Sequence, residues 1–322
     1  MRIHSKPLAY FYLALSMSLV GAYVALSKPL AATFPVLLLA WLRFGIGGVA
    51  MLGWLKRPAH EAPLPAKAKG LLFLESFFGN FLFTLCMITG VSMTSAVTAS
   101  VTMATIPAAI ALLSWLVLKE RISGRVMVAI SLAVLGIVLL ALAKPAAGAH
   151  AGAAAAAAAD ADPGKHWLGQ LLLVGAVLCE ACYAVIGKKL TSSLSPKRIA
   201  ALINLWGFVL TLPFGLYLAW HFDFGQVGTA TWLLLLGYAL AACMVTVWLW
   251  MTGLQVVPAS QSAVFTVMLP LSTALVGVVF LGETLGGLQM LAFAIAVSSL
   301  ALTTLPMPLR GRGQTVLRRD PD

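Results

Sequence analysis

The sequence predicts an all-α integral membrane protein of ten transmembrane helices, arranged as two inverted five-helix repeats. Composition, the placement of positive charge and internal repetition support this prediction. Of the 322 residues, 61% are hydrophobic and 10% are charged, whereas about 25% of the residues in a soluble domain are charged. The mean hydropathy of +0.98 likewise indicates that lipid surrounds most of the chain.

Ten apolar segments follow one another along the chain. Each is close to the length of about 20 residues that a helix needs to cross the hydrocarbon core of a bilayer. The predicted helices cover residues 7–26, 34–55, 70–89, 95–118, 126–143, 167–187, 199–220, 232–251, 259–281 and 286–305.

The positive charges fit this count. If the N-terminus is cytoplasmic, seventeen of the 21 lysines and arginines fall on the cytoplasmic side of the ten helices. Lys28, Lys144 and Lys165 fall on the outer side, and Arg43 lies inside a helix. Since cytoplasmic loops are enriched in positive charge, we expect both termini in the cytoplasm. The net charge of +11 then reflects topology, and no nucleic-acid partner is expected.

An alanine-rich stretch divides the chain near its middle. Residues 144–166 combine Ala, Gly, Pro and Asp, a composition typical of a flexible linker, and the charge pattern places them outside the cytoplasm. They separate a first five-helix repeat, residues 7–143, from a second, residues 167–305. Residues 306–322 form a basic cytoplasmic tail.

Matched residues recur at a nearly constant spacing in the two halves. Three pairs share one spacing, which we call the repeat offset: Pro107 and Pro270, Glu120 and Glu283, and Gly124 and Gly287. Two pairs share a slightly shorter one: Tyr23 and Tyr183, and Lys28 and Lys188. Because five helices per repeat is an odd number, the second repeat enters the membrane upside down. Inverted repeats are a recurring plan of secondary transporters, since the two halves can exchange conformations.

These motifs resemble the drug/metabolite transporter superfamily, and within it the EamA-type ten-helix transporters. The resemblance rests on "WLRFGIGG" (residues 41–48) and on the two Pro-to-Glu segments with their following glycine, and it covers residues from about 8 to 305. The chain departs from the pattern at Lys119, whose equivalent is Gly282, and the second half has no counterpart of Arg43. The resemblance implies a carrier of the bacterial inner membrane that works by alternating access. Such carriers are often exporters of amino acids or related small molecules.

Three ionisable residues fall inside predicted helices: Arg43, Glu75 and Glu180. A charge at the bilayer centre costs at least about 2.5 kcal/mol, so such residues usually have a role. One interpretation is a structural ion pair of Arg43 with Glu180. The other is that Arg43 binds a substrate carboxylate while a glutamate binds an amine or a coupling proton. The sequence leaves both open.

Further candidates are polar residues and prolines within the helices. Thr94, Thr98, Thr102 and Thr105 share one helical face, and Ser262, Thr266 and Thr273 form a looser one. These faces either line a central cavity or let helices pack closely. The candidate binding residues also include Tyr23, Tyr183, Asn80 and Asn204, and the candidate hinges are Pro107 and Pro270, where a mid-helix proline frees a backbone carbonyl.

Two other classes of membrane protein compete with a transporter. An integral-membrane enzyme would need catalytic groups, but every histidine and aspartate lies outside the predicted helices, so no metal, cofactor or catalytic residue is predicted. A channel would need a ring-like filter, and none is visible. A nucleotide-binding GxxxxGK[ST] motif is also absent, so transport must use a gradient. The substrate, the direction of transport, a coupling proton and a homo-oligomeric state stay open.

Overall fold

The computed structural model describes residues 5–57, 64–94, 96–142, 163–281 and 286–305, and within these ranges it consists of helices and loops without a strand. Prolines mark several helix starts: Pro35 precedes α2, Pro196 is the first residue of α10, and Pro258 precedes α13. Proline suits these positions because its fixed φ fits a helix start, where its missing N–H costs no hydrogen bond.

The first half of the chain alternates α-helices with short π- and 3₁₀-helical segments. In order they are α1 (Lys6–Thr33), α2 (Val36–Ala50), a 3₁₀ segment (Leu52–Leu55), α3 (Ala66–Ser76), a π segment (Phe77–Leu82), α4 (Phe83–Ser92), α5 (Ala96–Met103), α6 (Ile106–Leu113), a π segment (Ser114–Leu118) and α7 (Gly124–Leu142).

The second half is built in the same way. In order its elements are α9 (Pro163–Leu190), α10 (Pro196–Trp220), a 3₁₀ segment (Phe224–Gln226), α11 (Thr229–Ala239), a π segment (Leu240–Val245), α12 (Thr246–Val256), α13 (Ala259–Ser262), a 3₁₀ segment (Ala263–Val267), α14 (Met268–Leu281) and α15 (Gly287–Thr304).

Element boundaries recur between the halves at the repeat offset found in the sequence. Helices α3 and α11 are related by this offset at both their first and their last residues. The π segments that follow them, Phe77–Leu82 and Leu240–Val245, keep it at both ends, as do the starts of α7 and α15. The irregular turns therefore repeat together with the regular helices.

Eight helical stretches are long and apolar enough to cross a membrane. They are Ala66–Val91, Val101–Leu118, Gly124–Leu142, Trp167–Leu190, Pro196–Trp220, Thr229–Val256, Ala259–Val276 and Gly287–Thr304. The two remaining predicted segments correspond to α1, which has 28 residues, and to α2, an apolar helix of 15 residues. The protein is thus an all-helical, multi-pass membrane protein.

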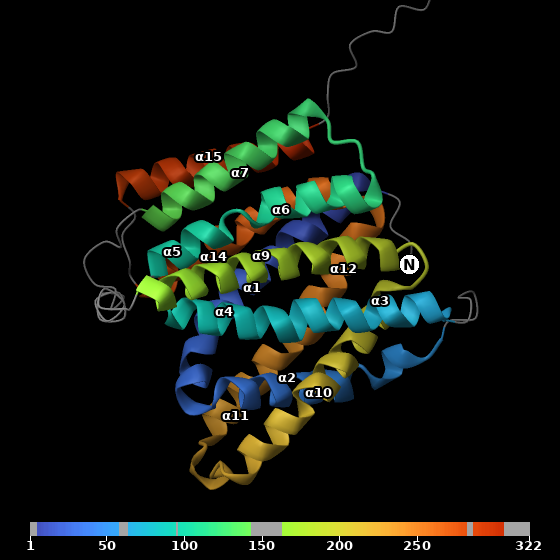
Figure 1. Cartoon of the computed structure of the whole chain (residues 1–322), viewed down its shortest axis with the longest axis vertical. Helices are drawn as coiled ribbons and strands as arrows, with labels where there is room; N and C mark the ends of the chain where they lie inside the picture. The colour runs from blue at the N-terminus through green and yellow to red at the C-terminus, as the bar shows by residue number, and fades with distance from the viewer. Residues whose placement is uncertain (1–4, 58–63, 95, 143–162, 282–285, 306–322) are drawn as a thin grey trace, which may run out of the picture.

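Helices of the two halves pack against each other throughout the molecule. Helix α7 lies along α15 at one end of the view in Figure 1, and α2 lies along α10 near the other end. Between them, α1 contacts α12 and α14, and α4 contacts α9. Each of these neighbours comes from the opposite half, so the contact between the halves runs through the centre of the fold.

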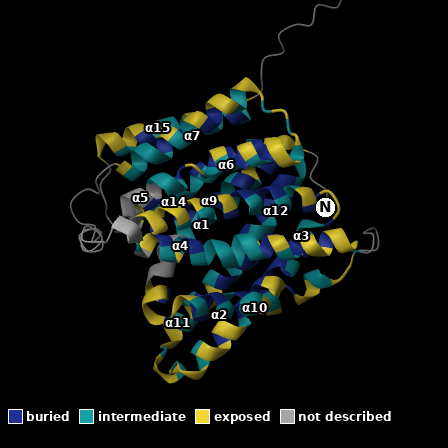
Figure 2. Cartoon of the chain, viewed as in Figure 1, coloured by how far each residue is buried: buried dark blue, intermediate teal, exposed yellow. Residues whose placement is uncertain are grey.

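The surface of the molecule is largely apolar. Figure 2 shows buried residues concentrated on the central helices and exposed residues on the outer ones. The exposed side chains include large hydrophobic ones such as Val49, 70% exposed, and Trp220, 89% exposed. A soluble monomer rarely exposes apolar patches of such extent, whereas a lipid bilayer accommodates them.

The structure corrects the predicted boundaries in three places. The segment 95–118 is not one continuous helix, because α5 ends before a turn at Ala104 and Thr105. The segment 259–281 is likewise interrupted, by the 3₁₀ turns of Ala263–Val267. Helix α9 begins at Pro163, inside the predicted linker, since a proline is tolerated in a first helical turn. Residues 143–162 and the predicted tail, 306–322, lie outside the described residues.

Candidate functional site

Arg43 of α2 contacts aromatic side chains from α2 and α11. Its Nη1 donates a hydrogen bond of 3.3 Å to the hydroxyl of Tyr238, which comes from α11. The guanidinium also lies 5.8 Å from the centre of the Tyr238 ring and 4.6 Å from that of Phe44. Tyr23 of α1 packs edge-on against Tyr238, with ring centres 5.4 Å apart. One arginine and two phenols from three helices therefore form a single contact group.

Glu75, Glu180 and Tyr183 are linked to this group by electrostatic interactions. The electrostatic environment of the Tyr23 hydroxyl includes Arg43 and Glu180, and that of the Tyr183 hydroxyl includes Glu75, Glu180 and Tyr23. We define the central polar cluster by these six residues, which are Tyr23, Arg43, Glu75, Glu180, Tyr183 and Tyr238.

The acidic side of the central polar cluster is closely packed. Glu75 is 0% exposed. The ring of Tyr183 lies against the backbone of the π segment, where a Cβ atom on Gly79 would come within 2.3 Å of the Tyr183 Cδ2 atom. A side chain at position 79 would displace this ring, so a glycine there allows Tyr183 to approach the cluster.

Arg43 and Glu180 do not pair with each other. Across the described ranges, the bonded partner of the Arg43 guanidinium is the Tyr238 hydroxyl, no ion pair joins it to Glu180, and its Nε has no hydrogen-bond partner. The Nε of Arg43 is thus a buried donor that no described side chain or carbonyl accepts. The structural ion pair is not formed in this conformation.

In the predicted Ser and Thr faces, most of the described hydroxyls bond to backbone carbonyls. Ser262 is 0% exposed and donates to the carbonyl of Ala259, while Thr266 donates to the carbonyl of Ala263. Thr102 is half-buried, and the side chain of Thr98 lies outside the described residues. The hydroxyls of Ser262 and Thr266 thus bond to their own helical turns.

The two asparagines connect helices. Asn80 donates to the hydroxyl of Ser76 and, at 3.4 Å, to the carbonyl of Ile203 on α10. Asn204 is buried and donates to the carbonyls of Ala200 and Cys243. Their amide groups therefore hold helix crossings beside the central polar cluster.

The prolines lie where the helices are irregular. Pro107 is buried in the first turn of α6, directly after the break at Ala104 and Thr105. Pro270 lies in the first turn of α14, after the 3₁₀ turns of Ala263–Val267. A proline lacks the N–H that continues a helix, which accounts for an interruption at both places.

Glu120 joins the two halves at one end of the molecule. Its carboxylate accepts hydrogen bonds from the backbone N–H groups of Ala259 and Ser260, both at 3.0 Å. The hydroxyls of Ser260, at 2.7 Å, and Ser114, at 2.6 Å, also donate to it. We call Glu120, Ser114, Ala259 and Ser260 the Glu120 latch.

The backbone conformation before Glu120 and the charge of its carboxyl group both favour the hydrogen bonds of the Glu120 latch. Lys119, the preceding residue, has a φ of 55° in the left-handed region, which glycine adopts more readily than other residues. Gly282, its equivalent in the sequence, lies outside the described residues. Burial of the Glu120 carboxyl raises its pKa, but hydrogen bonds from Ser114, from Ser260 and from the Ala259 backbone outweigh this, so the pKa of Glu120 is lower than usual. The carboxylate is thus held in its charged form.

The sequence did not reveal Tyr238 as a functional residue. A tyrosine inside an apolar helix is common, and nothing in its local sequence marks it. The repeat offset points to Tyr238, because it is the equivalent of Glu75. Each of the two residues lies two positions before the start of a π segment.

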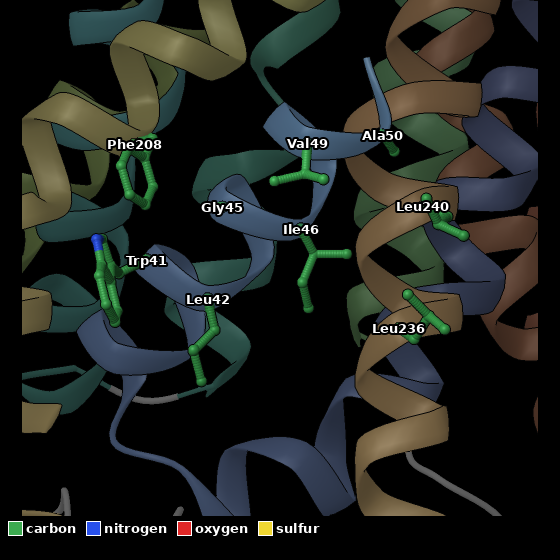
Figure 3. Close-up of a pocket in the computed structure, with 9 residues that line it drawn as sticks. All are labelled: Trp41, Leu42, Gly45, Ile46, Val49, Ala50, Phe208, Leu236 and Leu240. Atoms are coloured by element: carbon green, nitrogen blue, oxygen red, sulfur yellow. The ribbon is translucent and has the colours of Figure 1, made fainter. Parts of the chain in front are cut away.

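An open groove of about 550 Å³ lies on the outer side of α2, away from Arg43. Figure 3 shows Leu42 and Ile46 of α2 opposite Leu236 and Leu240. Its lining residues are all apolar or aromatic, so the groove suits hydrocarbon rather than a charged ligand. Across the described ranges, no three His, Cys, Asp or Glu residues lie together so as to hold a metal ion.

Comparisons with known proteins agree on one family. The model of the EamA-like transporter family matches residues 7–142 and 167–305. The uncharacterized transporter YetK of Bacillus subtilis (strain 168) is 31% identical over 92% of this chain and 87% of its own length. The uncharacterized transporter YwfM of the same organism is 28% identical over 80% of each chain. A solved crystal structure shares the fold, with a TM-score of 0.72 over 94% of this chain and 97% of that one, at 17% identity.

Proposed function

Since the chain belongs to the EamA-like transporter family, we propose that it is a secondary transporter that exports a small zwitterionic metabolite, such as an amino acid. The observation that carries this proposal is the central polar cluster, in which the Nε of Arg43 has no hydrogen-bond partner and both Arg43 and Glu180 interact electrostatically with Tyr23. A carboxylate fits the guanidinium of Arg43, because arginine presents several donors in a planar fork. An ammonium group fits Glu180. A zwitterion satisfies both groups at once.

The proposal includes ten transmembrane helices in two inverted repeats. The recurrence of helices and π segments at the repeat offset supports the repeats, and so does the match of one family model to two parts of the chain. With five helices in each repeat, the halves have opposite orientation. The binding site then falls at the interface between them, as in other inverted-repeat carriers.

The proposed location is the bacterial inner membrane, with both termini in the cytoplasm. The asymmetry of lysine and arginine supports this orientation. Under it, the Glu120 latch lies at the cytoplasmic end, beside the contacts of Gln261 with Tyr10 and Thr303 near the chain termini. The described conformation is then closed toward the cytoplasm at this point.

Ligand-dependent stability tests the substrate class. A ligand at 100 times its Kd stabilises a folded protein by about 2.7 kcal/mol, so the correct amino acid should raise the unfolding temperature of the purified protein. Its methyl ester, which lacks the carboxylate, and its N-acetyl derivative, which lacks the amine, should not. Equal stabilisation by either derivative would contradict binding between Arg43 and Glu180, and so would the absence of any shift across a panel of amino acids.

A further inference from the structure

Glu75 is the most deeply buried acidic group of the central polar cluster. Its side chain is 0% exposed, and neither carboxyl oxygen has a hydrogen-bond partner in the part of the chain that the structure describes. It lies against the backbone of Gly187 in α9 and near Met251 of α12. A Cβ atom on Gly187 would be 2.8 Å from Oε1 of Glu75 and 3.2 Å from the sulfur of Met251. The glycine thus leaves the space that the carboxyl group fills.

Among the described residues, no cation compensates this carboxyl group. Helices α9 and α10 are the long helices packed against α3. Their titratable residues with described side chains are Cys179, Glu180, Cys182, Tyr183, Lys188 and Lys189 of α9, and Lys197, Arg198 and Tyr217 of α10. Helix α12 and the π segment Phe77–Leu82 carry none. The ammonium group of Lys188 donates to the carbonyls of Leu254 and Val257, at the end of α12. In the described ranges, none of these groups bonds to Glu75.

Burial without a hydrogen-bond partner favours the protonated form of the Glu75 carboxyl group. An ionised carboxylate in a protein interior costs several kcal/mol unless a counter-ion and hydrogen bonds compensate it. The neutral acid avoids most of this cost, because a buried group that lacks partners binds a proton instead of remaining charged. Glu75 therefore carries a proton in this conformation.

The position of Glu75 in the repeat indicates that its burial has a role and is not accidental. Its equivalent at the repeat offset is Tyr238, which binds Arg43. Each of the two residues closely precedes a π segment, and such segments are frequent at functional sites. Glu75 lies near Tyr183 as Tyr238 lies near Tyr23, and these two tyrosines are also equivalent in the repeat. One half thus places an acid where the other places the phenol that holds Arg43.

We propose that Glu75 is the proton-binding site that couples this transporter to a proton gradient. The inference rests on the proposed function and adds the coupling ion and the residue that carries it. The carboxyl group holds one proton in the described conformation. When the two halves change conformation and water reaches the carboxyl group, Glu75 releases this proton. After the site opens to the opposite side of the membrane, the carboxylate takes up another proton from that side.

Glu75→Gln tests the coupling, because glutamine has the shape and the neutrality of the protonated acid. In liposomes, the wild-type protein should transport the zwitterion several-fold faster with a pH gradient than without one. Glu75→Gln should still exchange labelled for unlabelled zwitterion, but its rate should no longer respond to the gradient. Asp223→Asn, which changes an exposed carboxylate that bonds only within its own turn, should retain the response.

The outcomes separate this inference from the proposed function. If Glu75→Gln responds to the gradient like the wild type, the coupling site is wrong and the transporter stands. If the wild type moves no zwitterion under either condition, the proposed function fails, and infrared spectroscopy still decides the state of Glu75. The wild-type protein should show the band of a buried carboxylic acid at neutral pH, and Glu75→Gln should lack it. The absence of this band, or a Glu75→Gln protein that cannot fold, would overturn the proton site.

Discussion

Arg43→Ala is expected to lower zwitterion transport by more than a hundredfold while leaving a folded protein. Removing one partner of a buried charge pair costs about 3–5 kcal/mol, and each 1.36 kcal/mol is about a factor of ten in rate. The fold should survive because the bonded protein partner of the Arg43 guanidinium, within the described chain, is the single hydroxyl of Tyr238. Initial rates in proteoliposomes, together with gel filtration and unfolding temperatures, provide the measurement.

Two variants sharpen this prediction. Arg43→Lys keeps the charge but loses the planar fork of donors, so transport should fall by about tenfold rather than disappear. Arg125→Ala is a matched control, because Arg125 donates to the carbonyls of Leu302 and Leu305, away from the central polar cluster. It should leave the discrimination between the zwitterion and its methyl ester unchanged. Normal transport by a folded Arg43→Ala protein would remove Arg43 from the binding site.

Glu120→Ala is expected to open the end of the molecule that the Glu120 latch closes. The variant loses four hydrogen bonds to a carboxylate, and a hydrogen bond to a charged group contributes about 1.5–3 kcal/mol. A shift of about 1.4 kcal/mol already changes a conformational population tenfold. A cysteine at Ser262, which is 0% exposed beneath the latch, should therefore react at least about ten times faster with a water-soluble thiol reagent. The background should lack the four native cysteines.

Asp223→Asn is the control for this experiment, since Asp223 also accepts hydrogen bonds but only from Gly225 and Gln226 in its own turn. It should not change the labelling of the cysteine at position 262. Equal labelling of that cysteine with and without Glu120→Ala would show that the latch does not control access.

The pH dependence of the latch follows from its chemistry. The pKa of Glu120 in the folded protein is lower than the ordinary value of 4.5. The latch therefore contributes stability above that pH and loses it only as the pH falls through the lowered pKa. The rate of labelling at position 262 rises with pH as the thiol ionises, so it is compared with the rate for the same cysteine in the Glu120→Ala background. The ratio of the two rates should stay constant between about pH 6 and 8.

Much of the central site could be predicted from the sequence, because a charge inside an apolar helix is rare and conspicuous. Arg43, Glu75 and Glu180 were found in this way, and the repeat pointed to Tyr23 and Tyr183. In the structure, electrostatic interactions through Tyr23 and Tyr183 connect all five. Membrane helices also have a simple sequence requirement, a long apolar run, which is why the predicted segments fall on helical stretches of the fold, two of them interrupted.

Other features left no such signal. Ser262 and Thr266 are spaced so that they share one helical face, but each hydroxyl bonds to its own helical turn. The spacing would be the same if both hydroxyls lined a cavity, so it does not distinguish the two cases. The π segments have no composition of their own and are visible only in the backbone. The contacts of Glu120 with Ala259 and Ser260 join opposite halves of the chain, so they depend on how the halves pack.

Counterflow by the purified wild-type protein tests directly whether it transports a zwitterion. Liposomes that contain the protein are loaded in turn with each amino acid of a panel, and entry of the same labelled compound is followed at equal pH on both sides. The account predicts saturable entry of at least one zwitterion, absent from protein-free liposomes and reduced more than a hundredfold by Arg43→Ala. Entry no faster than in protein-free liposomes, for every compound of the panel, would contradict it.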